Sequence, residues 1–365
     1  MQFVSELLVL ILSLGLIGLF RKTKISQVFF IPPKTLEPEN FNYPAAYVVN
    51  GESSTVSIIN LNTNEVANLI QLTDGSGTQM QGMNMGKTLT FPHHIYLNTS
   101  KTQIAIAAPG MDLSAGHSGG MAGMKGKIAV LDAVTGVNVK IVETPIMNHN
   151  AIYSTDGKEI WTSQMDEVGK VLVYDATTFA LKSTILVGKE PAEVTFSNDG
   201  TVAFVANGMD NSVTAINPTT KAILATIPVG KNPVGAWIGS DNRMYVDNED
   251  GQTVSTIDVK TLKVVEIVAL GFMPGYVAYQ GDMKEMWVTD PMAGKVHWWT
   301  KDATGKMVRT GAFATAAGSH AIAFKDMTAY VTNQEAANVS VVDVMQHKVT
   351  KTIAVGKKPN GIVIR

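Results

Sequence analysis

The 365-residue sequence contains no cysteine. This absence excludes disulfides, thiolate metal centres and cysteine nucleophiles, so a bound metal would have to use imidazole, thioether, carboxylate or carbonyl ligands. Charged residues are also scarce, at 16% of the chain with a formal net charge of −2. Neither a basic patch nor an acidic tail is present, and this charge balance argues against nucleic acid as a ligand.

Long apolar runs are likewise rare, and the main one lies at the N-terminus. Leu7 to Phe20 is apolar and is followed by Arg21-Lys22-Thr23-Lys24. We expect residues 1–24 to form a hydrophobic helix acting as an uncleaved signal anchor, with a cleaved signal peptide or a buried helix as alternatives. The cations follow the run, and by the positive-inside rule this order would leave the rest of the chain on the cytoplasmic side. Residues 25–42, which include Pro32-Pro33, are predicted to be a linker.

The remainder of the chain is an internal repeat of about 40 residues, a period typical of propeller blades. Strong copies begin at Val187-Gly188-Lys189-Glu190-Pro191 and Val229-Gly230-Lys231-Asn232-Pro233. Each copy predicts four short strands with alternating β-branched residues. The first, innermost strands are expected to begin at Pro92, Asn148, Pro191, Pro233, Pro274, Ser319 and Pro359.

The ends of the repeat region complement each other. Residues 46–72 supply three outer strands before any inner strand, and Pro359 to Arg365 supplies an inner strand with nothing after it. Pairing of these segments would close the ring. The sequence therefore predicts an all-β, seven-bladed β-propeller over residues 43–365, closed by its C-terminal strand.

Three short elements indicate a family resemblance: the tetrad Tyr330-Val331-Thr332-Asn333, the Val-Gly-Lys-x-Pro entries and the Val-x-Val-x-Asp strands. In these elements residues 43–365 resemble the YVTN family of seven-bladed propellers. The resemblance implies the fold, while similar propellers serve as scaffolds, surface-layer proteins and cofactor domains. The architecture is also similar to the propellers of nitrous oxide reductase and of cytochrome-type nitrite reductases. The chain lacks the cysteine-bearing domain of the first and the Cys-x-x-Cys-His haem site of the second.

Histidine recurs at one position of the repeat. The residue after the proline equivalent is His93, His149 or His320 in three copies. In the other four copies it is Ala192, Val234, Gly275 and Asn360. After ring closure the histidines lie on one arc of the axial opening, which predicts a metal or cofactor site there. The alternative is that each histidine caps a backbone carbonyl. Strand alternation predicts that His94 points in a different direction from His93, as a supporting or interblade residue. We also include His94 among the candidate metal ligands.

Methionines cluster in the loops expected around the same opening. One loop contains Met83 and Met85, and a glycine-rich loop after Ala108 contains Met111, His117, Met121 and Met124. Thioether and imidazole together suit Cu(I), whereas imidazole alone suits Cu(II) or Zn(II). We expect His117, Met121 and Met124 to be lid ligands and the loop with Met83 and Met85 to capture metal. A methionine surface that contacts a protein partner is the alternative.

These observations predict a membrane-anchored or secreted propeller on the periplasmic or extracellular side. We expect it to bind a transition metal, with copper favoured, and to serve as a metal-handling accessory subunit with a protein partner in a membrane redox complex. Two alternatives remain open. One is a histidine-ligated copper oxidoreductase acting on a small substrate. The other is a metal-free interaction scaffold.

Overall fold

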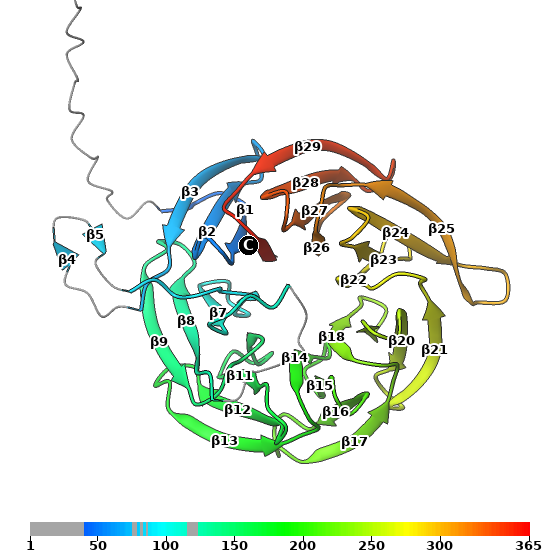
Figure 1. Cartoon of the computed structure of the whole chain (residues 1–365), viewed down its shortest axis with the longest axis horizontal. Coiled ribbons are helices and arrows are strands. Elements are labelled where there is room, and N and C mark those ends of the chain that lie inside the picture. The colour runs from blue at the N-terminus through cyan, green and yellow to red at the C-terminus, as the bar shows by residue number, and fades with distance from the viewer. Residues whose placement is uncertain (1–39, 75–78, 81–82, 85–86, 115–122) are drawn as a thin grey trace, which may run out of the picture. The chain divides into compact units, whose positions relative to one another are not determined.

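The repeat folds into four-stranded antiparallel sheets arranged around an axis (Figure 1). The computed structural model describes residues 40–74, 79–80, 83–84, 87–114 and 123–365. The chain divides into Met1–Leu36 and Glu37–Arg365. The predicted N-terminal helix and nearly all of the linker lie outside the described residues. Within the described ranges, no helix has the length and hydrophobicity needed to cross a bilayer.

The described residues contain seven four-stranded sheets, here called blades and listed from the first strand onwards. The first blade combines β1 (Ala45–Asn50), β2 (Thr55–Asn60), β3 (Glu65–Gln71) and β30 (Pro359–Ile364). The second contains β6 (Ile95–Leu97), β7 (Gln103–Ala108), β8 (Gly126–Asp132) and β9 (Asn138–Thr144). The third contains β10 (Ala151–Tyr153), β11 (Glu159–Gln164), β12 (Lys170–Asp175) and β13 (Leu181–Leu186). A short hairpin of β4 (Gln79–Met80) and β5 (Met83–Asn84) precedes the second blade.

The remaining four blades follow the chain without interruption. The fourth contains β14 (Pro191–Phe196), β15 (Ala203–Asn207), β16 (Ser212–Ile216) and β17 (Ile223–Pro228). The fifth contains β18 (Pro233–Ile238), β19 (Arg243–Asn248), β20 (Thr253–Asp258) and β21 (Lys263–Ala269). The sixth contains β22 (Tyr276–Gln280), β23 (Glu285–Asp290), β24 (Lys295–Lys301) and β25 (Met307–Ala314). The seventh contains β26 (Ser319–Lys325), β27 (Thr328–Asn333), β28 (Asn338–Asp343) and β29 (Lys348–Ala354).

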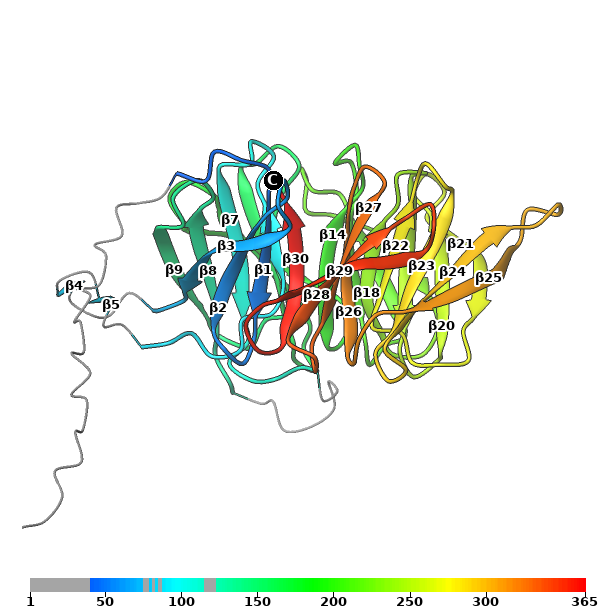
Figure 2. The same cartoon turned by 90° about the horizontal axis from the view of Figure 1, so that it is seen from above.

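The C-terminal strand closes the ring. β30 pairs antiparallel with β1, with Tyr47 opposite Val363 and Asn50 opposite Pro359. Figure 2 shows β30 beside β1, with the C-terminus at that blade. The predicted seven blades and their closure are therefore confirmed. Packing begins slightly before the predicted domain boundary, because Phe41 is buried in the core between the first and second blades.

The repeated motifs have a structural explanation. The asparagine that ends the second strand of a blade lies buried and holds the following turn: the Asn207 amide donates to Ser212 Oγ at 3.1 Å and Thr214 Oγ1 at 2.9 Å. The glycine of the preceding Val-Gly-Lys entry packs on that amide. A Cβ on Gly188 would lie 2.6 Å from Asn207 Cγ, which requires glycine there. The same arrangement recurs between Gly230 and Asn248.

The backbone departs from regular strand geometry at the start of several inner strands. The residue before the proline has a left-handed backbone in four blades, with φ of 46° at Phe91, 50° at Glu190, 52° at Asn232 and 51° at Lys358. The register between inner and second strands then shifts immediately after Pro191, Pro233 and Ser319. Such bulges redirect the side chains at the start of a strand. They occur at the repeat position that carries the histidines.

Candidate metal centre

A pocket of about 480 Å³ lies at one end of the inner strands. Its lining includes His93, His94, His149 and His320. Leu113 and Ser114 come from the loop between β7 and β8, and Met273 comes from the loop that enters β22. Inner-strand entries and loops between second and third strands therefore meet at the same opening, as the repeat predicted.

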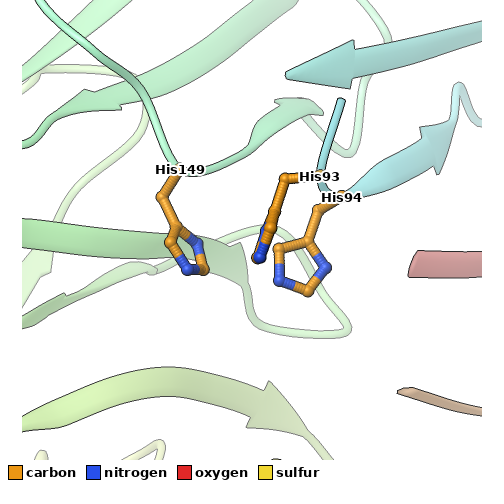
Figure 3. A group of neighbouring side chains, drawn as sticks. All are labelled: His93, His94 and His149. Atoms are coloured by element: carbon orange, nitrogen blue, oxygen red, sulfur yellow. The ribbon is translucent and has the colours of Figure 1, made fainter. Parts of the chain in front are cut away.

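Three imidazoles gather in this pocket. One ring nitrogen each of His93, His94 and His149 lies within 4.8 Å of the others, and all three residues are buried. The ring centroid of His93 is 4.4 Å from that of His94 and 4.7 Å from that of His149. Figure 3 shows the three rings side by side. Two ligand nitrogens on one tetrahedral ion are about 3.3 Å apart, which lies within this limit.

His94 lines the same pocket as His93, although strand alternation predicted a different direction for its side chain. Its inclusion among the candidate metal ligands agrees with this position. The His93 amide donates to Ala107 O at 2.8 Å, and the Ala107 amide donates to His94 O at 3.3 Å. Two residues just before β6 therefore oppose one residue of β7, which is the pattern of a β-bulge. Because the bulge interrupts the alternation of side chains, two consecutive histidines reach the same pocket.

His320 shares the pocket but stands farther from the group. Its ring centroid is 6.3 Å from that of His93 and 6.1 Å from that of His94. It also lies 6.4 Å from the ring of Tyr276. The arc of His93, His149 and His320 predicted from the repeat is therefore present at the pocket, while the tightest group contains His94 in place of His320.

A buried glutamate supports the histidines. Glu193 in β14 has no exposed surface, and its Oε2 is 2.9 Å from His149 Nδ1 and 3.7 Å from His94 Nε2. Its Oε1 accepts hydrogen bonds from the Tyr96 hydroxyl and from Asn150 Nδ2, the latter at 2.8 Å. With the His149 proton on Nδ1, its Nε2 is the nitrogen left to bind metal, an arrangement common around metal-bound histidine.

Burial raises the pKa of Glu193 to about 8, although hydrogen bonds from Tyr96 and Asn150 act in the opposite direction. A cation bound to the neighbouring imidazoles would favour the ionised carboxylate. Sequence reasoning missed this residue. The sequence signal was a single charged residue within the predicted inner strand that begins at Pro191. In the structure all six residues of that strand, Pro191–Phe196, are buried.

The predicted methionine ligands have mixed positions. Met111 and Met124 pack in a hydrophobic cluster with buried Leu113, Met147 and Met165. Met83 belongs to β5, and His117, Met121 and Met85 lie outside the described residues. The methionines among the described residues that line the pocket are Met273 and Met292. Among its described residues the pocket therefore offers four imidazoles and two thioethers.

His297 and His347 do not line the pocket. His297 stacks on Phe272 with ring centroids 4.5 Å apart. His347 stacks on Trp298 at 3.9 Å, and its Nε2 is 2.8 Å from Glu285 Oε2. These contacts agree with packing roles.

No protein-family model and no curated protein matches this chain in sequence. Solved structures of similar fold include the periplasmic gluconolactonase of Pseudomonas aeruginosa, with a TM-score of 0.66, 14% identity and coverage of 88% of this chain and 99% of that one. Hydrazine synthase of Kuenenia stuttgartiensis aligns with a TM-score of 0.63 and 18% identity over 78% of this chain and 92% of its own. A dihydro-heme d1 dehydrogenase aligns with a TM-score of 0.59 and 13% identity over 90% of this chain and 75% of its own. At these identities the likeness establishes the seven-bladed propeller fold alone.

Proposed function

We propose that this propeller binds a transition metal ion at its axial pocket through His93, His94 and His149. The observation that carries the proposal is the meeting of three buried ring nitrogens within 4.8 Å. A carboxylate hydrogen-bonded to His149 Nδ1 supports it, since metal-binding histidines commonly donate their second N–H to such a group. His320 lines the same pocket and is a candidate fourth ligand.

The ligand set favours Cu(II) or Zn(II). Imidazole binds both ions well, and first-row affinities rise to a maximum at copper. The Cu(I) expectation depended on thioether ligands, and Met111 and Met124 lie in the neighbouring hydrophobic cluster. We therefore propose copper as the ion, held mainly by imidazole.

A site for a small molecule beside the metal favours a second candidate function, that of a metalloenzyme. Three protein ligands leave a coordination position open, as catalytic metal sites do. The pocket volume of about 480 Å³ falls in the range of small-molecule sites. A dihydro-heme d1 dehydrogenase and a hydrazine synthase are among the similar folds, which supports a role in redox chemistry.

The location and partner are part of the same proposal. The apolar run Leu7 to Phe20 supports a membrane anchor or an export signal, and similarity to a periplasmic lactonase supports an extracytoplasmic site. We propose an accessory or catalytic subunit of a membrane redox complex, anchored by its N-terminal segment.

Metal binding is tested by loading the full chain with Cu(II) and separately with Zn(II). The loaded protein is then desalted and its metal content measured by elemental analysis. We expect one ion per chain in the wild type and almost none in a variant with His93, His94 and His149 all changed to alanine. His347→Ala removes an imidazole outside the pocket and should retain the metal.

Circular dichroism must show that both variants are folded. Equal metal content in the wild type and the triple variant would refute the site. If the wild type binds the metal, turnover of oxygen or of small nitrogen oxides by the loaded protein distinguishes an enzyme from a metal carrier.

A further inference from the structure

The fifth blade gives the axial pocket an acidic and aromatic wall. Trp237 comes from the inner strand β18, and Asp247 from β19. Glu249 and Asp250 follow in the next turn and also line the pocket. No lysine or arginine is present among the described residues that line it. Three carboxylates without a basic side chain create a negative potential in this part of the pocket.

Asp247 is the most constrained of these carboxylates. Only 1% of its surface is exposed. Its Oδ1 accepts a hydrogen bond from Trp237 Nε1 at 2.6 Å, and its Oδ2 accepts one from the Gly235 amide at 3.3 Å. A Cβ on Gly235 would lie 2.3 Å from Oδ1, so glycine permits this close arrangement.

Asp247 has no cationic partner within ion-pair distance among the described residues. A buried carboxylate without a compensating cation is costly. Burial, and secondarily the charge of Glu249, raise the pKa of Asp247 to about 7. A bound cation would remove much of this cost, and the carboxylate faces a pocket large enough to admit one.

We propose that the fifth-blade wall of the axial pocket binds a small organic ammonium ion, with Asp247 as its buried counter-ion. This inference deepens the proposed function, because the ligand would lie in the pocket that holds the metal. Glu249 and Asp250 would attract the cation at the rim. Trp237, Val234 and Met273 offer apolar contacts for its carbon atoms.

The surroundings favour an organic cation over a second metal ion. Hard divalent ions need six or more oxygen ligands, whereas both oxygens of Asp247 already accept N–H groups. The ring of Trp237 lies 4.0 Å from that of Tyr276 and 5.6 Å from that of His94. A carboxylate beside aromatic rings is a typical environment for an alkylammonium group.

The test is a titration of chelator-treated, full-length protein with ethylammonium chloride. Ethanol serves as the uncharged comparison and calcium chloride as the hard cation. The readout is the indole N–H resonance of Trp237, assigned by its loss in Trp237→Phe. We expect a saturable shift with ethylammonium and none with ethanol or calcium.

Asp247→Asn keeps the hydrogen-bond acceptor for Trp237 and removes the charge. We expect it to weaken ethylammonium binding at least about 30-fold, the effect of removing one partner of a buried charge pair. Asp326→Asn, at an exposed turn, should bind like the wild type. If Asp247→Asn does not fold, Glu249→Gln replaces it, with an expected loss of about threefold.

A shift with calcium alone, no saturable shift, or wild-type affinity in the charge-removing variant would overturn the proposal. Metal content is measured separately in amine-free protein. Normal metal loading without amine binding would therefore refute only the amine site. Amine binding without metal loading would refute only the metal site.

Discussion

Replacing Glu193 with glutamine tests whether this residue sets the metal-binding tautomer of His149. Glu193 Oε1 accepts hydrogen bonds from Tyr96 and Asn150, so the amide oxygen of glutamine must occupy that position. Its NH₂ group then faces His149 Nδ1, which must become an acceptor. The His149 proton moves to Nε2, the nitrogen that would hold the metal. We expect metal affinity to fall by about 10- to 100-fold, the usual effect of losing such a supporting group.

The same substitution should preserve or raise the stability of the metal-free fold at pH 8. Burial raises the pKa of Glu193 to about 8. The folded chain therefore keeps a proton that the unfolded chain releases near pH 4.5. Between these values stability falls with rising pH, by at most about 1.4 kcal/mol per pH unit and hence about 4 kcal/mol from pH 5 to 8. Glutamine cannot ionise, so Glu193→Gln should be at least as stable as the wild type at pH 8.

Competition with a chromophoric chelator measures the metal affinity, and urea unfolding of chelator-treated protein measures stability. Asp326→Asn changes an exposed carboxylate outside the pocket and is the control. Unchanged metal affinity in Glu193→Gln, with a folded protein, would show that Glu193 does not position His149.

Three further predictions follow from the ring and its pocket. Deleting residues 359–365 removes β30 and should abolish the cooperative thermal transition, whereas a wild-type melting temperature would contradict ring closure. Between pH 5 and 8 the free energy of unfolding in urea should fall more steeply for metal-free wild type than for Glu193→Gln. An equal dependence on pH in both proteins would show that Glu193 is not the group that ionises. His93→Ala should lose most of the metal while His320→Ala retains most of it, because His320 stands outside the closest group; equal losses by elemental analysis would make His320 an equal ligand.

The sequence was sufficient to predict the architecture because the fold is local and repeated. Six of the seven blades pair only strands that are adjacent in the chain, so alternation and turn residues specify them one unit at a time. The motif Val-Gly-Lys-x-Pro and the terminal asparagine recur because Gly188 must pack on the Asn207 amide and Gly230 on that of Asn248. Closure through β30 was also predictable, since the ends of the repeat carry complementary missing strands.

The site depended on contacts between blades, which no single repeat records. The shared position of His93, His149 and His320 indicated the pocket, but strand alternation misplaced His94 because the bulge opposite Ala107 was not visible in the sequence. Glu193 lies in another blade from the histidines it supports, and Asp247 lines the same pocket from the fifth blade. Local periodicity thus specifies the blades, whereas the chemistry at the axis arises where bulged inner strands from different blades converge.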